Sequence, residues 1–190
     1  GFEPEKSQVS EVVSAVYQSM DAIVPGPMRV MRWIKAHVGQ YIRSGATEVE
    51  WTTPSGFVVN QQRNKRETER LKLQLLGTTQ VTLSVGDGDP CPNRHKSSTA
   101  PNLIHSLDAS ILHETFQRFN GPFTVIHDSV LCRATDMGTL NQLVRETYTD
   151  IFTRDCWLSK FGEAINAAEP PPIVGTLDPE VVEDSTYFFC

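Results

Sequence analysis

The adjacent residues His127 and Asp128 are the most chemically suggestive pair in the sequence. They lie between two short apolar runs, residues 123–126 and 130–131, which predicts a β-hairpin with the pair at its tip. Such a tip can present an imidazole and a carboxylate side by side. Mg²⁺ takes one or two protein carboxylates and keeps water or phosphate oxygens in its remaining positions. The pair is therefore a candidate metal site, although the same dipeptide is also common in ordinary turns.

A second group of polar residues falls in the segment P-N-L-I-H-S-L-D-A-S at 101–110. His105 and Asp108 are three residues apart, so a helix would place both on one face. Taken alone, the two residues are more typical of a capping pattern or a surface pair than of a functional site. A Ser-His-Asp hydrolase would need a nucleophile elbow such as G-x-S-x-G, which the sequence lacks. A hydrolase with a His-Asp metal site would need further ligands, and the remaining histidines have no metal-binding spacing.

A basic segment runs from Gln61 to Lys72 and contains five basic and two acidic residues. Its basic residues are Arg63, Lys65, Arg66, Arg70 and Lys72. The whole chain has a net charge of −6 and a pI of about 5.3, which argues against a free-standing nucleic-acid binder. Local charge can still create a basic surface in an acidic protein. A solvated strand rich in Lys and Arg is the simpler interpretation of this segment.

The composition permits one sizeable core, because 39% of the 190 residues are hydrophobic. The four cysteines contain no C-x-x-C pair, which favours a reducing compartment. No apolar run reaches membrane-spanning length, and the first residues, GFEPEKSQ, do not resemble a secretory signal. We therefore expect no membrane partner.

Hydrophobic periodicity predicts the elements that must position these residues. Helices are expected over 7–43, with a break at 25–27, and over 102–119 and 137–152. Alternating residues predict a hairpin over 47–60, and a strand near 71–75 with one buried face. Residues 86–99 have the composition of a loop, and the proline-rich stretch 166–180 is expected to be irregular.

Three segments, taken in order, resemble the last part of phage-type single-subunit DNA-dependent RNA polymerases. They are APNLIHSLDAS, TVIHDSV and LVRETYTDIF, followed by an aromatic-rich end. The family pattern P-N-x-x-H-S-x-D-x-S is met at Pro101, Asn102, His105, Ser106, Asp108 and Ser110. The strand–HDS–strand motif is met at His127, Asp128 and Ser129. The resemblance covers the chain from about residue 47, and the first forty residues fit only as generic helices.

This resemblance implies an α+β fold and a nucleotidyltransferase that uses two Mg²⁺ ions. Asp128 would be one of two metal-binding carboxylates, with His127 and Ser129 supporting it. His105 would contact nucleic acid near the end of the RNA primer. The family's second aspartate, and its nucleotide-binding Lys and Tyr, lie upstream of this segment. The chain alone is therefore expected to be inactive, with a larger N-terminal polymerase chain, nucleoside triphosphates, promoter DNA and the RNA transcript as partners.

The resemblance also implies a specificity loop, a β-hairpin that enters the major groove of the promoter. It would begin after residues 53–57 and return near Gly77. Its base-reading positions would be Arg70, Lys72, Gln80 and Thr82. Its phosphate contacts would be Arg63, Lys65 and Arg66. A two-stranded ribbon fits this groove, and Arg, Lys and Gln can reach base edges.

The implied organisation has four parts: fingers helices at 1–46, the specificity hairpin and a connecting loop at 47–100, the palm at 101–165, and a C-terminal foot at 166–190. The foot would end with Phe189 and Cys190 docked near the active site. We expect a phage product in the cytoplasm of an infected bacterium, on the length of the specificity loop and the absence of a targeting segment.

Two alternatives remain open at this stage. One is a non-catalytic promoter-binding or DNA-binding module, in which only the basic hairpin functions. The other is the palm of a family A DNA polymerase, which also carries a His-Asp pair. Those polymerases place Glu after the Asp, whereas Ser129 stands here.

Overall fold

The computed structural model describes residues 6–73, 79–172 and 175–188. Within these ranges the chain is α+β, with helices alternating with three separate antiparallel hairpins. In chain order the elements are α1 (Lys6–Ile23), α2 (Pro25–Arg43), β1 (Val49–Thr52), β2 (Val58–Gln61), β3 (Asn64–Leu73), β4 (Thr79–Pro90), α3 (Pro92–Arg118), β5 (Phe123–Ile126), β6 (Ser129–Cys132), α4 (Met137–Arg154) and α5 (Trp157–Ala164). Two short 3₁₀ turns, η1 (Ala134–Asp136) and η2 (Pro179–Val182), complete them.

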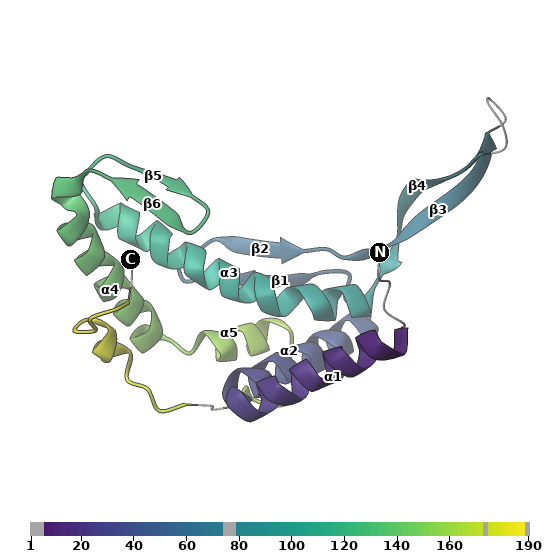
Figure 1. Cartoon of the computed structure of the whole chain (residues 1–190), viewed down its shortest axis with the longest axis horizontal. Coiled ribbons are helices and arrows are strands. Elements are labelled where there is room, and N and C mark those ends of the chain that lie inside the picture. Colours follow the sequence, from purple (N-terminus) through teal and green to yellow (C-terminus); the bar gives the residue numbers. More distant parts are fainter. Residues whose placement is uncertain (1–5, 74–78, 173–174, 189–190) are drawn as a thin grey trace.

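The long helix α3 connects two hairpins of different character. The β3–β4 hairpin projects from the body near the N-terminal end of α3, and the β5–β6 hairpin follows its C-terminal end (Figure 1). The 27 residues of α3 correspond to about 40 Å of helix at 1.5 Å per residue. The length of α3 therefore sets the distance between the two hairpins.

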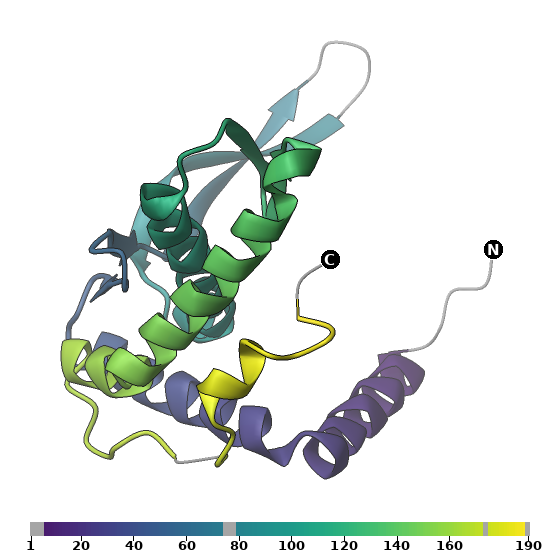
Figure 2. The ribbon, with the colours of Figure 1, turned by 90° about the vertical axis from the view of Figure 1, so that its left-hand side faces the viewer.

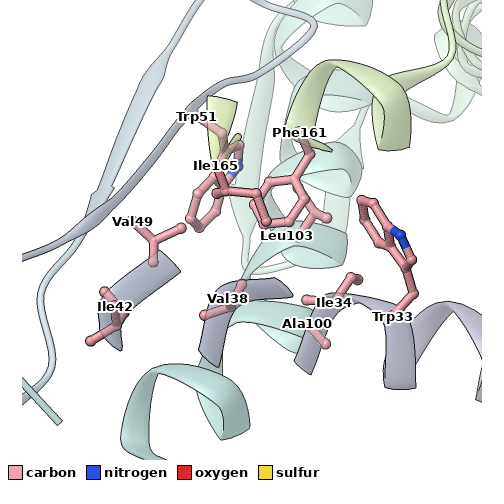
Figure 3. Packing of buried hydrophobic residues seen from close by; sticks show 10 residues of the cluster. All are labelled: Trp33, Ile34, Val38, Ile42, Val49, Trp51, Ala100, Leu103, Phe161 and Ile165. Atoms are coloured by element: carbon pink, nitrogen blue, oxygen red, sulfur yellow. The ribbon is translucent and has the colours of Figure 1, made fainter. Parts of the chain in front are cut away.

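The main core lies where α2, α3, α5 and the β1–β2 hairpin meet (Figure 3). Strand β1 alternates buried and exposed residues, so Val49 and Trp51 both point inward. The Trp51 ring meets Phe161 edge to face, with centroids 5.9 Å apart. The core members are Trp33, Ile34, Val38, Ile42, Val49, Trp51, Ala100, Leu103, Phe161 and Ile165. This core holds α3 against the N-terminal half of the chain.

A smaller cluster joins α4 to the C-terminal end of α3. Phe119, Leu140 and Val144 are its buried members. Arg118 of α3 reinforces the contact with hydrogen bonds to Glu146 at 2.9 Å and Asp150 at 3.0 Å. The cluster and this ion pair together orient α4 relative to α3.

The prediction of a loop over 86–99 is wrong. Residues 86–90 complete strand β4, and α3 begins at Pro92 rather than near Asn102. Pro92 supplies a favourable first helical residue, since its missing N–H is not needed there. The hydroxyls of Ser97, Ser98 and Thr99 bond back to carbonyls three or four residues earlier. A polar, loop-like composition is thus accommodated inside a helix.

Two expected burial patterns also differ from the structure. The prediction of one buried face on the strand near 71–75 is wrong at its described position, because Leu71 of β3 is 41% exposed. Helix α1 forms as predicted, but its apolar side chains stay exposed, among them Val12 at 64% and Ile23 at 78%. Figure 2 shows α1 at the edge of the molecule, beside α2.

The helix break predicted at 25–27 lies one residue earlier, because α2 begins at Pro25, and three other predicted elements are confirmed. The hairpin near 47–60 is β1–β2, and the helix predicted over 137–152 is α4. The hairpin around the His-Asp pair is β5–β6, with Ile126 paired to Ser129. Among the described helices, none is both long and apolar enough to cross a membrane.

Candidate active site and nucleic-acid interface

Residues of the two suggestive motifs line one cavity. The cavity has a volume of about 800 Å³ and lies between α3, α4, the β5–β6 turn and the end of the chain. Its polar lining consists of His105, Asp108, His127 and Asp128, and the rest is mainly apolar. The structure therefore brings together three of the predicted catalytic residues, which are up to 23 residues apart in sequence.

The β5–β6 turn presents its two residues through an unusual backbone conformation. His127 has a φ of 58°, in the left-handed region, and Asp128 follows it as the second turn residue. Tight two-residue hairpin turns that match strand twist require a positive φ at this first position, which usually favours Gly or Asn. A histidine here costs local strain, of the kind that functional sites hold in place with surrounding structure.

Aromatic packing holds the base of this hairpin. The ring of Phe123 on β5 stacks on Phe116 of α3, with centroids 3.8 Å apart and planes 6° from parallel. Phe119 meets the same Phe123 ring edge to face at 6.3 Å. These contacts tie β5 to α3, the helix that carries His105, so both cavity motifs share one support.

Ser129, the third predicted residue of the motif, is placed differently. It is the first residue of β6 and is exposed. It is not among the residues that line the cavity, whereas both turn residues are. Any support that Ser129 gives to Asp128 would act from the strand rather than from the cavity.

His105 also borders a second, more polar pocket. That pocket of about 610 Å³ is lined by residues 59–63 with Asn102 and His105. Gln61 is buried at its floor, where it donates to Thr99 at 2.8 Å and accepts from Asn102 at 2.7 Å. His105 thus stands between the His-Asp cavity and the base of the β3–β4 hairpin.

The base of the long hairpin is fixed to α3 by His95 and Arg63. The buried His95 ring accepts the backbone N–H of Arg63 at its Nε2, at 3.2 Å. The Arg63 guanidinium donates to Ser98 Oγ at 3.2 Å, and the Arg63 carbonyl accepts from Cys91 N at 2.8 Å. Burial, and secondarily the nearby positive Arg63, lower the pKa of His95 and favour its neutral form.

The four predicted base-reading positions lie together on the hairpin. Arg70 is the cross-strand partner of Thr82, and Lys72 is the partner of Gln80. Positions two apart along a strand and their direct cross-strand partners belong to one face of an antiparallel ribbon, so the register puts the four positions on the same face. The hairpin extends into solvent, and Arg70, Gln80 and Thr82 are exposed.

The three predicted phosphate-contacting residues are less alike. Lys65 and Arg66 are exposed on β3, as phosphate contacts require. Arg63 lies just before β3, is partly buried, and is engaged with Ser98. The predicted foot residues Phe189 and Cys190 lie outside the described residues.

The donor groups at the cavity can be compared with what a magnesium ion requires. No group of three or more acidic, His or Cys side chains that could hold a metal ion occurs among them. Asp128 is an exposed carboxylate at the cavity, and magnesium needs only one or two carboxylates when substrate phosphates complete its shell. Asp128, with Asp108 also in the lining of the cavity, could therefore hold one side of a magnesium ion.

Three cavity-related residues were missed as functional candidates. Tyr148 and Phe188 line the cavity, and their rings meet at 5.1 Å. The buried Arg145 lies over the Phe188 ring, with its Cζ 5.6 Å from the centroid. Tyr148 had the spacing of a core residue and Arg145 only a place in the V-R-E-T run. The aromatic chain end was the available signal for Phe188.

Comparison with known proteins shows which family the chain resembles. A family model described as DNA-dependent RNA polymerase matches residues 4–168. The DNA-directed RNA polymerase of Pseudomonas phage phiKMV is 28% identical over 184 residues, covering 95% of this chain and 22% of the relative. T7 RNA polymerase of Escherichia phage T7 is 28% identical over 157 residues, covering 72% of this chain and 18% of the relative.

A plant relative matches as well. DNA-directed RNA polymerase 2, chloroplastic/mitochondrial, of Arabidopsis thaliana is 31% identical over 181 residues, covering 90% of this chain and 17% of the relative. The chain therefore spans about a fifth of the length of these curated relatives. The expectation that the first forty residues fit only as generic helices is wrong, because the family match begins at residue 4 and includes α1 and α2.

Proposed function

The chain belongs to the DNA-dependent RNA polymerase family, and we propose that it is the C-terminal part of a single-subunit enzyme whose active site it completes with Asp128. The observation that carries the proposal is the shared cavity, which His105 of one motif lines together with His127 and Asp128 of the other. The family match alone would not require these residues to meet. In this assignment residues 101–165 form the palm and residues 1–46 belong to the fingers.

The proposed reaction is the addition of a nucleoside triphosphate to the 3′ hydroxyl of the RNA. Magnesium, when bound, would activate this hydroxyl and neutralise charge on the leaving pyrophosphate. Asp128 would hold one side of the metal site from the hairpin tip, and an upstream carboxylate would hold the other. His127 would support Asp128 from the same turn, and Ser129 would support it from the start of β6.

His105 would contact the nucleic acid near the reacting end. Its place between the catalytic cavity and the polar pocket at residues 59–63 supports this role. A nucleic-acid strand that leaves the cavity past His105 would reach the base of the β3–β4 hairpin. Positioning of this kind accounts for much of the rate enhancement of phosphoryl transfer, where the protein does little covalent chemistry itself.

The β3–β4 hairpin would be the specificity loop. Arg70, Lys72, Gln80 and Thr82 would read base edges in the major groove, and Arg66 with Lys65 would contact phosphates. The strand register, which puts the four base-reading positions on the same face of the hairpin, supports this assignment. Arg63 would contribute to the phosphate contacts from the anchored base of the hairpin.

The remaining assignments concern partners and place. The chain would act with the larger upstream polymerase region, promoter DNA, nucleoside triphosphates and the RNA transcript. The end of the chain, including Phe189 and Cys190, would form the foot beside the cavity, because Phe188 already lines it. The length of the specificity loop favours a phage enzyme working in the cytoplasm of an infected bacterium.

The decisive experiment is Asp128→Asn in the complete polymerase that contains this chain. The substitution keeps the size of the side chain but removes the charge that a metal ion needs. We expect nucleotide incorporation to fall by at least about a thousandfold, and promoter binding, measured by fluorescence anisotropy, to stay within twofold. Asp21→Asn is the matched control, since Asp21 is an exposed α1 residue whose partner is Arg32.

The rival function is a DNA-binding module without catalysis. The projecting β3–β4 hairpin, on which Lys65, Arg66 and Arg70 are exposed, is the observation that favours it. Under this rival, Asp128→Asn would leave both promoter binding and RNA synthesis unchanged. Unchanged synthesis would therefore refute the proposed role of Asp128 and leave the hairpin as the functional element.

A further inference from the structure

Arg145 on α4 is a buried charged residue that the proposed reaction does not use. Arg145 is only 7% exposed, yet its guanidinium donates its hydrogen bonds to neutral oxygen atoms. Nη1 donates to the carbonyls of Val182 at 2.6 Å and Ser185 at 2.7 Å, and Nε donates to Asn141 Oδ1 at 2.7 Å. A buried guanidinium is costly unless its donors are satisfied. Arg145 is thus committed to the backbone of the chain end.

The contacts continue from Arg145 to the cavity. The segment that Arg145 holds leads to Phe188, whose ring lies under the Arg145 guanidinium at 5.6 Å. The same ring meets Tyr148 edge to face at 5.1 Å. Phe188 and Tyr148 both line the cavity that contains His105 and Asp128. The chain end therefore forms part of the wall of the candidate active site, and Arg145 holds it there.

The neighbours of Arg145 in the V-R-E-T run secure the other side of α4. Val144 is buried and lines the cavity. Glu146 and Thr147 both accept from Arg118 of α3, at 2.9 Å and 3.3 Å. Four consecutive residues thus hold α4 against α3 and hold the chain end against α4. This arrangement gives the motif a physical role that its sequence did not reveal.

We propose that Arg145 is a positioning residue for nucleotidyl transfer, which clamps residues 182–185 so that Phe188 forms a wall of the cavity at the His127–Asp128 turn. This inference rests on the proposed function. A fixed apolar wall limits the positions that reactants and water can take, and small misplacements of reacting groups are costly in rate. Arg145 acts through Phe188 and touches no reacting atom.

Hydrogen exchange tests the clamp without reference to activity. In the complete polymerase, Arg145→Gln should speed exchange of the amides of Val181, Glu183 and Ser185, which hydrogen-bond within residues 178–185, in and just before the clamped segment. Arg145→Lys should give an intermediate effect, because an ammonium can reach the carbonyls but lacks the planar fork that also engages Asn141. Arg32→Gln, which removes an exposed pair with Asp21, is the matched control. Unchanged exchange in Arg145→Gln would overturn the proposal.

Transcription kinetics test whether the clamp acts through Phe188. Arg145→Gln and Phe188→Ala should each lower kcat roughly tenfold to a hundredfold, with KM for nucleotides nearly unchanged. The double variant should be no slower than the slower single variant, since both remove the same wall. Multiplying effects would show that Arg145 acts independently of Phe188 and would overturn the proposal.

The Asp128→Asn and Arg145→Gln experiments distinguish a failure of this inference from a failure of the proposed function. If Asp128→Asn leaves RNA synthesis unchanged, the proposed function fails, and the exchange experiment still reports on the clamp. If Asp128→Asn abolishes synthesis but Arg145→Gln alters neither exchange nor kcat, only the positioning role fails.

Discussion

The β5–β6 and β3–β4 hairpins differ in how the rest of the chain supports them. The β5–β6 hairpin has strands of four residues, and the Phe116–Phe123 stack ties it to α3. The β3–β4 hairpin has strands of ten and twelve residues and projects into solvent. Leu71 and Leu83 on it are 41% and 44% exposed. Both hairpins are anchored at the base, but the turn of β5–β6 follows only four residues after its anchor at Phe123, whereas the strands of β3–β4 extend far beyond theirs.

This difference follows from what each hairpin would have to do. A catalytic carboxylate must be held to within a fraction of an ångström, so its hairpin needs a short distance between the anchored base and the tip. A hairpin that reads DNA along its length must keep its strands accessible to the groove. Tertiary support near the tip would obstruct that function. Support at the base, through His95 and Arg63, leaves the strands free.

The largest effect should come from removing the support of the short hairpin. Phe123→Ala deletes the ring that stacks on Phe116 and meets Phe119. Because Phe123 is 44% exposed, we expect a loss of roughly 2–3 kcal/mol in unfolding free energy, less than for a fully buried Phe. Thermal unfolding of the complete polymerase measures this loss, and transcription should fall with it because the His127–Asp128 turn loosens.

A matched control defines what would contradict this expectation. Phe57, at 61% exposure in the β1–β2 connection, carries the same side chain outside both core clusters. Phe57→Ala should cost no more than about 0.5 kcal/mol. Equal effects of the two substitutions would mean that the stack gives β5–β6 no special support, and the contrast between the hairpins would fail.

The long hairpin should show the opposite response, with binding affected and stability unchanged. Arg70→Gln removes an exposed side chain from the face with the four base-reading positions. We expect a loss of about 1–3 kcal/mol in discrimination at one base pair of the promoter, with no change in thermal unfolding. A competition binding assay against single-base promoter variants measures the discrimination.

Arg66→Gln provides the comparison for phosphate contact. This change should weaken binding to all DNA sequences alike and reduce the salt dependence of binding by about one unit of slope. If Arg70→Gln behaved in the same uniform way, Arg70 would be a phosphate contact, and the base-reading face of the hairpin would have to be reassigned.

Local patterns predicted most of the elements, and long-range contacts decided the rest. The alternation of Val49 and Trp51 and the polar tip at His127 and Asp128 were sufficient to predict two hairpins. The first part of α3 was not predictable from composition, because its Ser and Thr hydroxyls bond within the helix. Its helical state also depends on His95 and Thr99 being buried against Gln61, a contact 34 to 38 residues away.

The same distinction applies to the candidate site. The two motifs were recognisable one by one, but their meeting in one cavity depends on the length and direction of α3. Arg145 could not be recognised from sequence, because its acceptors are backbone carbonyls of residues that no side-chain pattern identifies. Helix α1 shows a related limit of sequence-based prediction. Its hydrophobic periodicity predicts a buried face, but no other part of the described chain covers that face.

The smallest expected effect is a pH response confined to the base of the long hairpin. His95 has a lowered pKa in the folded chain, so the neutral ring that accepts from Arg63 N–H is favoured there. Above pH 6.5, the ordinary pKa of histidine, His95 is neutral in both the folded and the unfolded chain. Its contribution to the free energy of unfolding is then at its full value. As the pH falls below 6.5, the unfolded chain takes up the proton first, and stability declines by at most about 1.4 kcal/mol per pH unit until the folded pKa is reached. Exchange of the Arg63 and Cys91 amides, corrected for intrinsic rates, should therefore accelerate between pH 7 and pH 5, relative to the amides of β5–β6. Equal acceleration in both hairpins would show that the acid response is global and that His95 does not control the base of β3–β4.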